Sequence, residues 1–221
     1  MKPHENPFRV SQLEELAFRD DRVTVEDLLH RFGRMNRCAA ILGPHGSGKS
    51  TLLDELRERL ARSRFDVPLV QLRTDRRTLD RAHQRIVASC DTGTILCVDG
   101  ADLMPRLHWH RLRRRARSAG GLLVTSHDRV LLPALHRCST SPPLLHKLVR
   151  ELLGDEPIPP ELDLEALYRK CRGNVRDALR ELYDSFGDSF GDSFGDAFGD
   201  RIEDWFATRT SLSGPRREGS G

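Results

Sequence analysis

A nine-residue, glycine-rich segment carries the strongest chemical signal in this chain. It reads Gly43-Pro44-His45-Gly46-Ser47-Gly48-Lys49-Ser50-Thr51, which fits the pattern G-x-x-x-x-G-K-[ST]. Glycines let the backbone turn tightly and approach phosphate oxygens, and successive N–H groups can then point at the anion. The segment therefore predicts a phosphate-binding loop, and ATP is the expected ligand.

The last three residues of this loop have separate predicted roles. Lys49 would reach the β- and γ-phosphates as a positive charge, and Ser50 would place its hydroxyl on Mg²⁺. Thr51 would support the start of the following helix or contact the α-phosphate. The positive N-terminal end of that helix would add to anion binding.

Two acidic residues after an apolar run are candidates for metal binding and catalysis. Asp99 follows Thr94–Val98 and is predicted to hold Mg²⁺ as a Walker B carboxylate, with an ordinary turn-capping aspartate as the alternative. Attack of water on a γ-phosphate usually needs a positioned carboxylate, and glutamate often follows the Walker B aspartate. Gly100 stands at that position, so the nearest acid, Asp102, is the predicted water activator. Its alternative role is to cap the next helix.

A second apolar run ends in polar residues. Gly121–Val124 is followed by Thr125, Ser126 and His127. A polar side chain at such a strand end can contact the γ-phosphate or orient the attacking water, and Thr125 or Ser126 is the candidate. His127 is equally consistent with a surface position.

Alternating apolar runs and helical patterns would position these residues. Strands are expected at 38–42, 68–72, 94–98 and 121–125, with a possible fifth around Cys138, and helices at 49–63, 76–88, 105–119 and 130–135. This alternation predicts an α/β fold, a three-layer P-loop NTPase core with a parallel β-sheet. The expected core spans residues 37–156. Residues 1–36 would form an N-terminal arm with a short helix at 25–32.

The pattern changes in the C-terminal third. Helices are expected at 144–153, 162–171 and 175–183, and Pro157, Pro159 and Pro160 indicate a boundary. Residues 157–184 are therefore predicted to form a small C-terminal α-helical lid.

A tandem repeat of Ser/Ala-Phe-Gly-Asp follows at residues 185–200. Each repeat glycine would cost a helix interior about 1 kcal/mol, so a weak helix or a disordered spacer is expected. The tail, residues 201–221, is expected to be largely disordered.

Taken together, these features resemble the AAA+ group of P-loop ATPases over roughly residues 37–184. Asn6-Pro7-Phe8 resembles the segment that lies against adenine in such proteins. Gly173–Leu179 resembles the sensor-2 stretch of clamp-loader and origin-recognition ATPases. There an arginine contacts the γ-phosphate, and Arg176 is the matching residue.

Each of these resemblances leaves an alternative. Arg176 could instead be a surface arginine paired with Asp177 or Glu181. Leu135–Cys138 resembles the Ser-Arg-Cys stretch of clamp loaders, with His in place of Ser. This implies that Arg137 could reach the ATP of a neighbouring subunit, although an ordinary residue at the start of a strand is the simpler interpretation.

The segment Asp99–Asp102 also looks like the Walker B region of NACHT-type signalling ATPases. Those chains normally continue into long sensor repeats, so a minimal stand-alone AAA+-like protein is the preferred interpretation.

A strongly basic segment, Arg106–Arg117, lies between the third and fourth expected strands. A solvated helix face, partly neutralised by acids such as Glu55 and Glu58, is the simpler interpretation. The alternative is contact with the phosphate backbone of DNA or RNA.

Composition sets wider bounds. The net charge of +3 is too small to imply nucleic acid by itself, and no apolar run approaches the length of a membrane-spanning helix. No signal peptide is evident, so a cytoplasmic location is expected. The five cysteines lack metal-site spacing and are expected to be buried, reduced thiols.

Three functions fit these residues. The first is Mg²⁺-dependent ATP hydrolysis coupled to lid motion. The second is a nucleotide-dependent switch or interaction module that does not hydrolyse ATP, which Gly100 favours. The third is a small-molecule kinase, for which Arg76, Arg77 and Arg81 are the only candidate acceptor-site group. A protein partner of unspecified identity is expected, and the sequence is also compatible with a homo-oligomer.

Overall fold

The computed structural model describes residues 23–75, 77–127, 131–154, 157–160 and 162–189, with the backbone alone for 185–189. Its elements in chain order are α2 (Val25–Arg34), β1 (Cys38–Leu42), α3 (Lys49–Arg62), β2 (Leu69–Gln71), α4 (Arg81–Ser89), β3 (Ile95–Asp99), η1 (Ala101–Leu103), α5 (Arg106–Arg115), η2 (Ala116–Ser118), β4 (Gly121–Ser126), β5 (Ala134–Arg137), α6 (Pro142–Leu153), α7 (Leu164–Lys170) and α8 (Val175–Ser189). Within these ranges no helix is long and apolar enough to cross a membrane. Residues 1–22, and with them Asn6-Pro7-Phe8, lie outside the described part.

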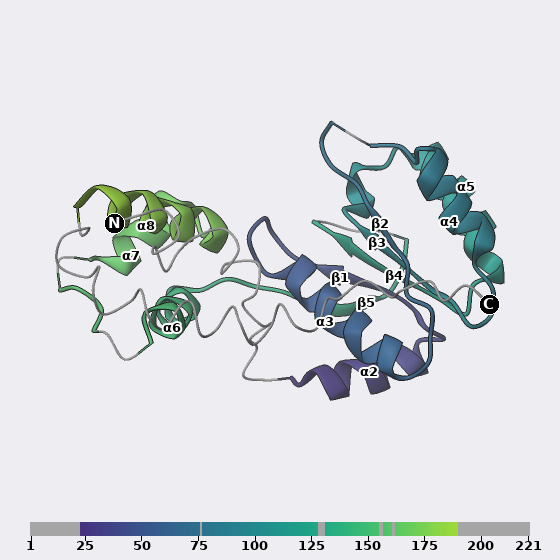
Figure 1. The fold of residues 1–221 in the computed structure, drawn as a ribbon, viewed down its shortest axis with the longest axis horizontal. Coiled ribbons are helices and arrows are strands. Elements are labelled where there is room, and N and C mark those ends of the chain that lie inside the picture. The colour runs from purple at the N-terminus through teal and green to yellow at the C-terminus, as the bar shows by residue number, and fades with distance from the viewer. Residues whose placement is uncertain (1–22, 76, 128–130, 155–156, 161, 190–221) are drawn as a thin grey trace, which may run out of the picture.

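The five strands form one sheet in the order β2-β3-β4-β1-β5 (Figure 1). Every pairing between neighbouring strands is parallel. Parallel strands need a crossover connection, and the helices between them supply it. The predicted α/β fold with a parallel sheet is confirmed.

Alternate side chains of the strands serve two apolar layers. In β1, Ala39 and Ile41 pack with α2 and α3 on one face, whereas Ala40 and Leu42 pack with the layer of α4 and α5 on the other. Figure 1 shows α2 and α3 below the sheet and α4 and α5 above it. All four residues are at most 4% exposed, as expected for a strand covered on both faces.

Two expected helix positions are wrong. The helix expected at 130–135 is not formed over its described part, because residues 134–137 form strand β5 beside β1. The helix expected from residue 76 begins at Arg81, because the Asp80 carboxylate caps it by accepting the His83 N–H at 2.8 Å. Both outcomes depend on contacts that apolar patterning does not reveal.

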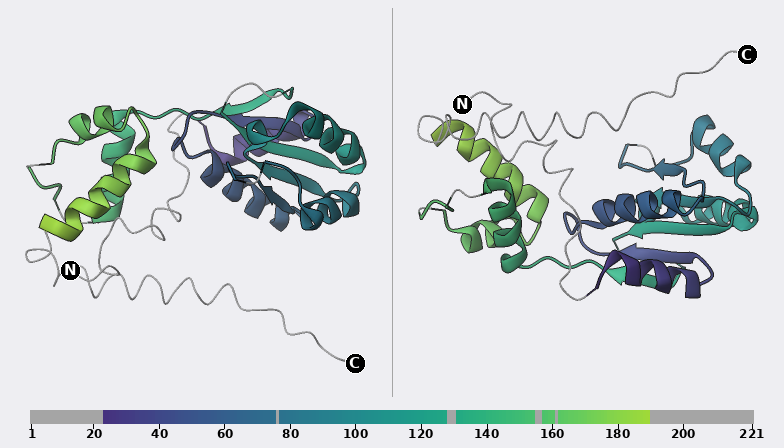
Figure 2. Two further views of the ribbon diagram at one scale, coloured as in Figure 1. Left: turned by 90° about the horizontal axis from the view of Figure 1, so that it is seen from above. Right: turned by 60° about the horizontal axis from the view of Figure 1, so that its bottom comes forward.

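The last three helices share a separate apolar cluster. Leu145 and Val149 of α6 pack with Leu164 of α7 and with Val175 and Leu179 of α8. Figure 2 shows this helical group beyond the sheet, joined to it by the segment that follows β5. We therefore propose that the helical lid begins near Pro142. Helix α8 extends through the first copy of the tandem repeat to Ser189, and the rest of the repeat, residues 190–200, lies outside the described residues.

Candidate functional site

The glycine-rich loop joins β1 to α3, as the sequence predicts. Gly46 and Gly48 have φ angles of 69° and 82°, a conformation that glycine adopts without strain. A Cβ on Gly46 would lie 1.9 Å from Asn174 Oδ1, so the loop and the lid meet here without room for a side chain. Gly48 is the N-cap of α3 and has no side chain to satisfy the first N–H groups of the helix. Those donors remain available to an anion.

Lys49 lies inside the cleft at the start of α3. Its Nζ donates to the Pro44 carbonyl at 2.6 Å, and Ser47 Oγ donates to the same oxygen at 2.8 Å. Burial lowers the pKa of Lys49, while the charges of Cys138, Asp102 and Asp99 oppose this shift. The ammonium is thus held in a partly desolvated position where an anion would stabilise it.

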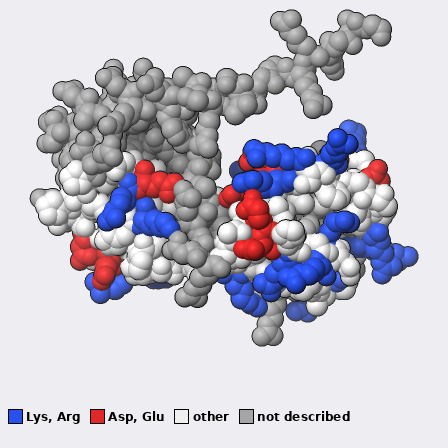
Figure 3. All heavy atoms as spheres, turned by 90° about the horizontal axis from the view of Figure 1, so that it is seen from below, with Lys and Arg blue, Asp and Glu red and all other residues white. Residues whose placement is uncertain are grey.

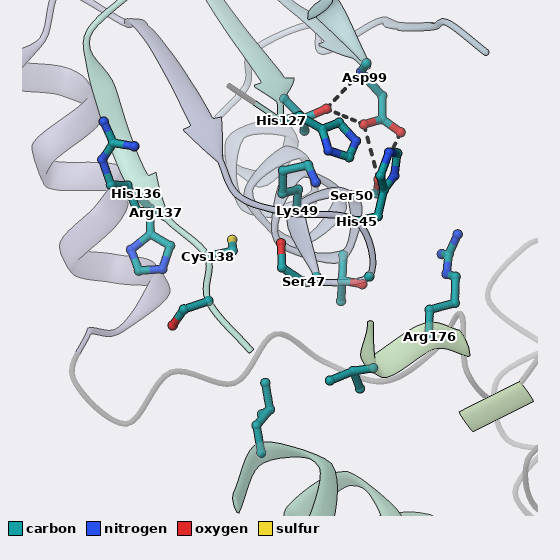
Figure 4. A pocket seen from close by; sticks show the side chains of 18 of the residues that line it. His45, Ser47, Lys49, Ser50, Asp99, His127, His136, Arg137, Cys138 and Arg176 are labelled. Atoms are coloured by element: carbon teal, nitrogen blue, oxygen red, sulfur yellow. Dashed lines mark hydrogen bonds between the residues drawn. The ribbon is translucent and has the colours of Figure 1, made fainter. Parts of the chain in front are cut away.

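Asp99 is held by two hydroxyl groups (Figure 4). Ser50 Oγ donates to its Oδ2 at 3.0 Å, and Thr125 Oγ1 donates to its Oδ1 at 2.5 Å. The Gly100 N–H donates to the same Thr125 oxygen at 2.8 Å. Because β3 and β4 are adjacent and parallel, their carboxyl ends bring Asp99 and Thr125 together. The Thr125 hydroxyl proton is therefore used to orient Asp99.

Beyond Thr125, the strand end presents His127 to the cleft. Ser126 is fully buried, whereas His127 lines the cleft. The backbone N–H of His127 donates to Asp102 Oδ1 at 3.2 Å. The centroid of the His127 ring is 3.4 Å from the centroid of the His45 ring. Sequence reasoning left His127 undecided and gave His45 no role of its own. No local signal could have paired them, since one follows β1 and the other follows β4.

The lid contributes Asn174 and Arg176 to the same place. Asp177 interacts with Asn174 at 2.5 Å and Arg180 at 3.9 Å, and Glu181 pairs with Lys170. Arg176 makes no ion pair with any residue in the described ranges, so it does not pair with Asp177 or Glu181. Its charge contributes to lowering the pKa of Lys49, and Figure 4 shows it extending from α8 toward the side that holds His45 and Asp99.

The cleft between core and lid has a volume of about 1090 Å³. All the residues proposed for catalysis line it: Lys49, Asp99, Asp102, Thr125 and Arg176. Apolar side chains form part of its wall: Leu135, Leu144, Leu148, Val175 and Leu179. Arg137 lines it from β5 and is exposed. A mixed polar and apolar wall of this kind suits a ligand with a charged end and a flat apolar end.

Metal-binding donors in this region are few. Within the described ranges, no group of three or more His, Cys, Asp or Glu side chains is placed to hold a metal ion. Mg²⁺ needs fewer protein ligands, since it keeps several waters and binds substrate phosphates. Ser50 and Asp99 are the two side chains that fit this mode. Cys90, Cys97 and Cys138 are buried, as predicted, and burial raises the pKa of Cys97 to about 12. Cys38 and Cys171 are only partly buried, so the prediction of buried thiols is wrong for these two.

Helix α5 does not have the acidic neighbours expected from the sequence. Glu55 and Glu58 lie on α3, which covers the opposite face of the sheet. Glu58 pairs there with Arg62 at 2.5 Å. The predicted neutralisation of α5 by these two acids is therefore wrong.

The solved structures similar to this chain share its fold at low sequence identity. The Thermotoga maritima RuvB Holliday junction branch migration motor matches with a TM-score of 0.54, 16% identity, and coverage of 90% of this chain and 70% of that one. A replication initiator DnaA bound to AMPPCP and single-stranded DNA matches with a TM-score of 0.54, 13% identity, and coverage of 87% and 68%. Cdc6p from Pyrobaculum aerophilum matches with a TM-score of 0.50, 15% identity, and coverage of 82% and 65%.

This likeness concerns the fold alone. The chain spans about two thirds of the length of these three structures. No protein-family model matches the sequence, and no curated protein sequence is similar to it.

Proposed function

We propose that this chain, whose core has the fold of AAA+ P-loop ATPases, binds ATP with Mg²⁺ between its sheet and its helical lid and hydrolyses it. The observation that carries the proposal is the arrangement around the loop. Open N–H groups at the start of α3, the partly buried ammonium of Lys49 and the Ser50–Asp99 pair converge on one cleft. These are the groups that a triphosphate and its metal require.

The residues present fit Mg²⁺. The Ser50 hydroxyl and the Asp99 carboxylate already lie within hydrogen-bonding distance of each other, at 3.0 Å, so both can turn their oxygens to one cation. The Thr125 hydroxyl keeps the carboxylate in place by donating to its Oδ1. When bound, Mg²⁺ would neutralise part of the charge on the phosphates.

Asp102 supports hydrolysis. It lines the cleft, and the His127 N–H fixes one of its oxygens at 3.2 Å. The other oxygen can accept a proton from an attacking water. In this proposal Thr125 acts by orienting Asp99, while the imidazoles of His45 and His127 lie beside the reacting phosphate.

One observation favours the non-hydrolysing switch as a second candidate. Gly100 has a φ of 80°, and a Cβ there would lie 3.1 Å from the Leu72 carbonyl oxygen. This backbone disfavours any side chain directly after Asp99, including the glutamate that many ATPases carry at that position. In the hydrolysis proposal, Asp102 therefore takes the place of that glutamate as the water activator.

The lid would respond to the bound nucleotide through α8. Asn174 contacts the loop at Gly46, and Arg176 has no acidic partner among the described residues. A γ-phosphate would give Arg176 that partner and thereby favour the closed arrangement. Arg137, exposed on β5, remains the candidate for reaching a second copy of the chain.

Release of inorganic phosphate from ATP tests this proposal. We expect magnesium-dependent turnover that Asp102→Asn lowers by about 100-fold while ATP binding persists. Tight ATP binding without turnover, in every condition tested, would establish the switch instead. Transfer of labelled γ-phosphate to a molecule other than water would establish a kinase.

A further inference from the structure

The two helix layers of the core carry different charge. Helices α4 and α5 with η2 contain eight arginines and no aspartate or glutamate: Arg81, Arg85, Arg106, Arg111, Arg113, Arg114, Arg115 and Arg117. Helices α2 and α3 contain six basic residues, Arg31, Arg34, Lys49, Arg57, Arg59 and Arg62, and five acidic residues, Glu26, Asp27, Asp54, Glu55 and Glu58. The small net charge of the whole chain hides this asymmetry.

The charges of the two layers also differ in their partners. On the α2–α3 layer, Arg57 pairs with Asp54 at 2.8 Å and Arg59 with Glu26 at 3.2 Å. Figure 3, seen from the side of α2, shows basic and acidic side chains together on this face. None of the eight arginines on the other layer forms an ion pair or hydrogen bond with a residue in the described ranges. Unpaired like charges on one face create a positive potential that attracts polyanions.

The arginines of α5 face outward because its apolar residues face the sheet. Trp109, Leu112 and Ala116 are buried. Arg106, Arg111, Arg114, Arg115 and Arg117 are exposed on the opposite arc. A ten-residue helix is about 15 Å long. Since duplex DNA carries about one negative charge per 1.7 Å of axis, about nine phosphate charges lie along that length.

We propose that this face, α4 and α5 with η2, binds the phosphate backbone of a nucleic-acid duplex without reading its sequence. A single strand would need exposed aromatic rings on which its bases could stack. Trp109 is only 7% exposed and cannot serve. A membrane surface would need an apolar stripe, and Leu107 is the only large hydrophobic side chain exposed on the described part of this face. The charge pattern therefore favours a duplex.

The test is fluorescence anisotropy of a labelled duplex titrated with the full chain over a range of salt concentrations. The variant combines Arg111→Gln, Arg114→Gln and Arg115→Gln. The matched control combines Arg34→Gln, Arg62→Gln and Arg64→Gln, which remove the same charge from exposed positions on the α2–α3 side. We expect the α5 variant to make the slope of log affinity against log salt shallower by about 2.7 units. The control should keep the slope of the unmodified chain.

Other outcomes would overturn the proposal. Equal losses in the α5 variant and the control would show an effect of net charge alone. Binding to anionic vesicles with no binding to duplex would assign the face to membranes, and preference for one of two unrelated duplexes would contradict backbone recognition. ATP binding and melting temperature, measured in parallel, should be the same in all three proteins, which keeps failure of this proposal separate from failure of the nucleotide site.

Discussion

Two regions of the molecule concentrate charge: the carboxyl edge of the sheet, which comprises Lys49, Ser50, Asp99 and Thr125, and the α4–α5 face. They differ in whether the charged side chains have hydrogen-bonding partners. At the carboxyl edge, Asp99 accepts hydrogen bonds from Ser50 and Thr125, and Lys49 donates a hydrogen bond to the Pro44 carbonyl. On the α4–α5 face, no arginine has a charged or hydrogen-bonded partner within the described ranges. Positioned charges suit one small ligand in one geometry, whereas unpositioned charges suit a polymer that presents phosphates in many registers.

This contrast separates two kinds of experimental response. Substitutions at the edge should have large effects that depend on the particular residue. Substitutions on the α4–α5 face should have small effects that add together and that salt suppresses.

The largest effect is expected for Asp99→Asn. It removes the charge that Ser50 and Thr125 orient, so metal-dependent turnover should fall by about 100- to 1000-fold. Phosphate-release kinetics over a range of Mg²⁺ concentrations measure this. Asp91→Asn, an exposed aspartate outside the cleft, is the control. Comparable losses in both variants would count against a special role for Asp99.

The second-largest loss of turnover is expected for Asp102→Asn. It keeps the oxygen that accepts the His127 N–H but weakens the proposed base, so turnover should fall by about 100-fold. Affinity for ATP, followed with a fluorescent analogue, should stay close to that of the unmodified chain. Unchanged turnover would mean that another group activates the water.

Gly46→Ala should have an intermediate effect on stability. Alanine at a φ of 69° is strained, and its Cβ would collide with Asn174, so we expect a loss of about 1–2 kcal/mol and weaker ATP binding. Gly33→Ala is the matched control. It lies in α2 with no atom within 4 Å of the added Cβ, and should stabilise the protein by up to about 1 kcal/mol. Chemical denaturation measures both, and equal shifts would contradict close loop–lid contact.

The smallest effects belong to single arginines of α5. Arg114→Gln should reduce the salt slope of duplex binding by about 0.9 unit, and Arg111→Gln should do the same. The double variant should show the sum. Loss of all duplex binding from either single change would contradict additive binding. It would show that the α4–α5 face depends on one particular residue, as the carboxyl edge is expected to do.

The sequence predicted those parts of the molecule that local patterns determine. The loop 43–51 is a contiguous motif, and the apolar runs of β1, β3 and β4 are long enough to be identified. The contact of Thr125 with Asp99 could not be predicted, because it depends on β3 and β4 being neighbours in the sheet. The pairing of His45 with His127 also requires two loops that meet only in the folded chain.

The wrong predictions for residues 134–137 and for Glu55 also arise because the arrangement of strands and helices in the folded chain cannot be read from local sequence. Residues 134–137 become a strand because β1 offers an open edge, not because of their own propensity. Glu55 was expected near α5, but a sheet separates α3 from α5. Sequence distance does not reveal on which face of a parallel sheet each crossover helix lies.

The most direct test of the nucleotide site is calorimetric titration of ATP and Mg²⁺ into the unmodified chain and into Lys49→Met. Burial lowers the pKa of Lys49, which means that its positive charge destabilises the ligand-free protein. The melting temperature of Lys49→Met should therefore be no lower than that of the unmodified chain. We predict saturable one-to-one binding that the variant weakens by about 100-fold. Absence of binding by the folded, unmodified chain, or equal affinity in both proteins, would contradict the proposal.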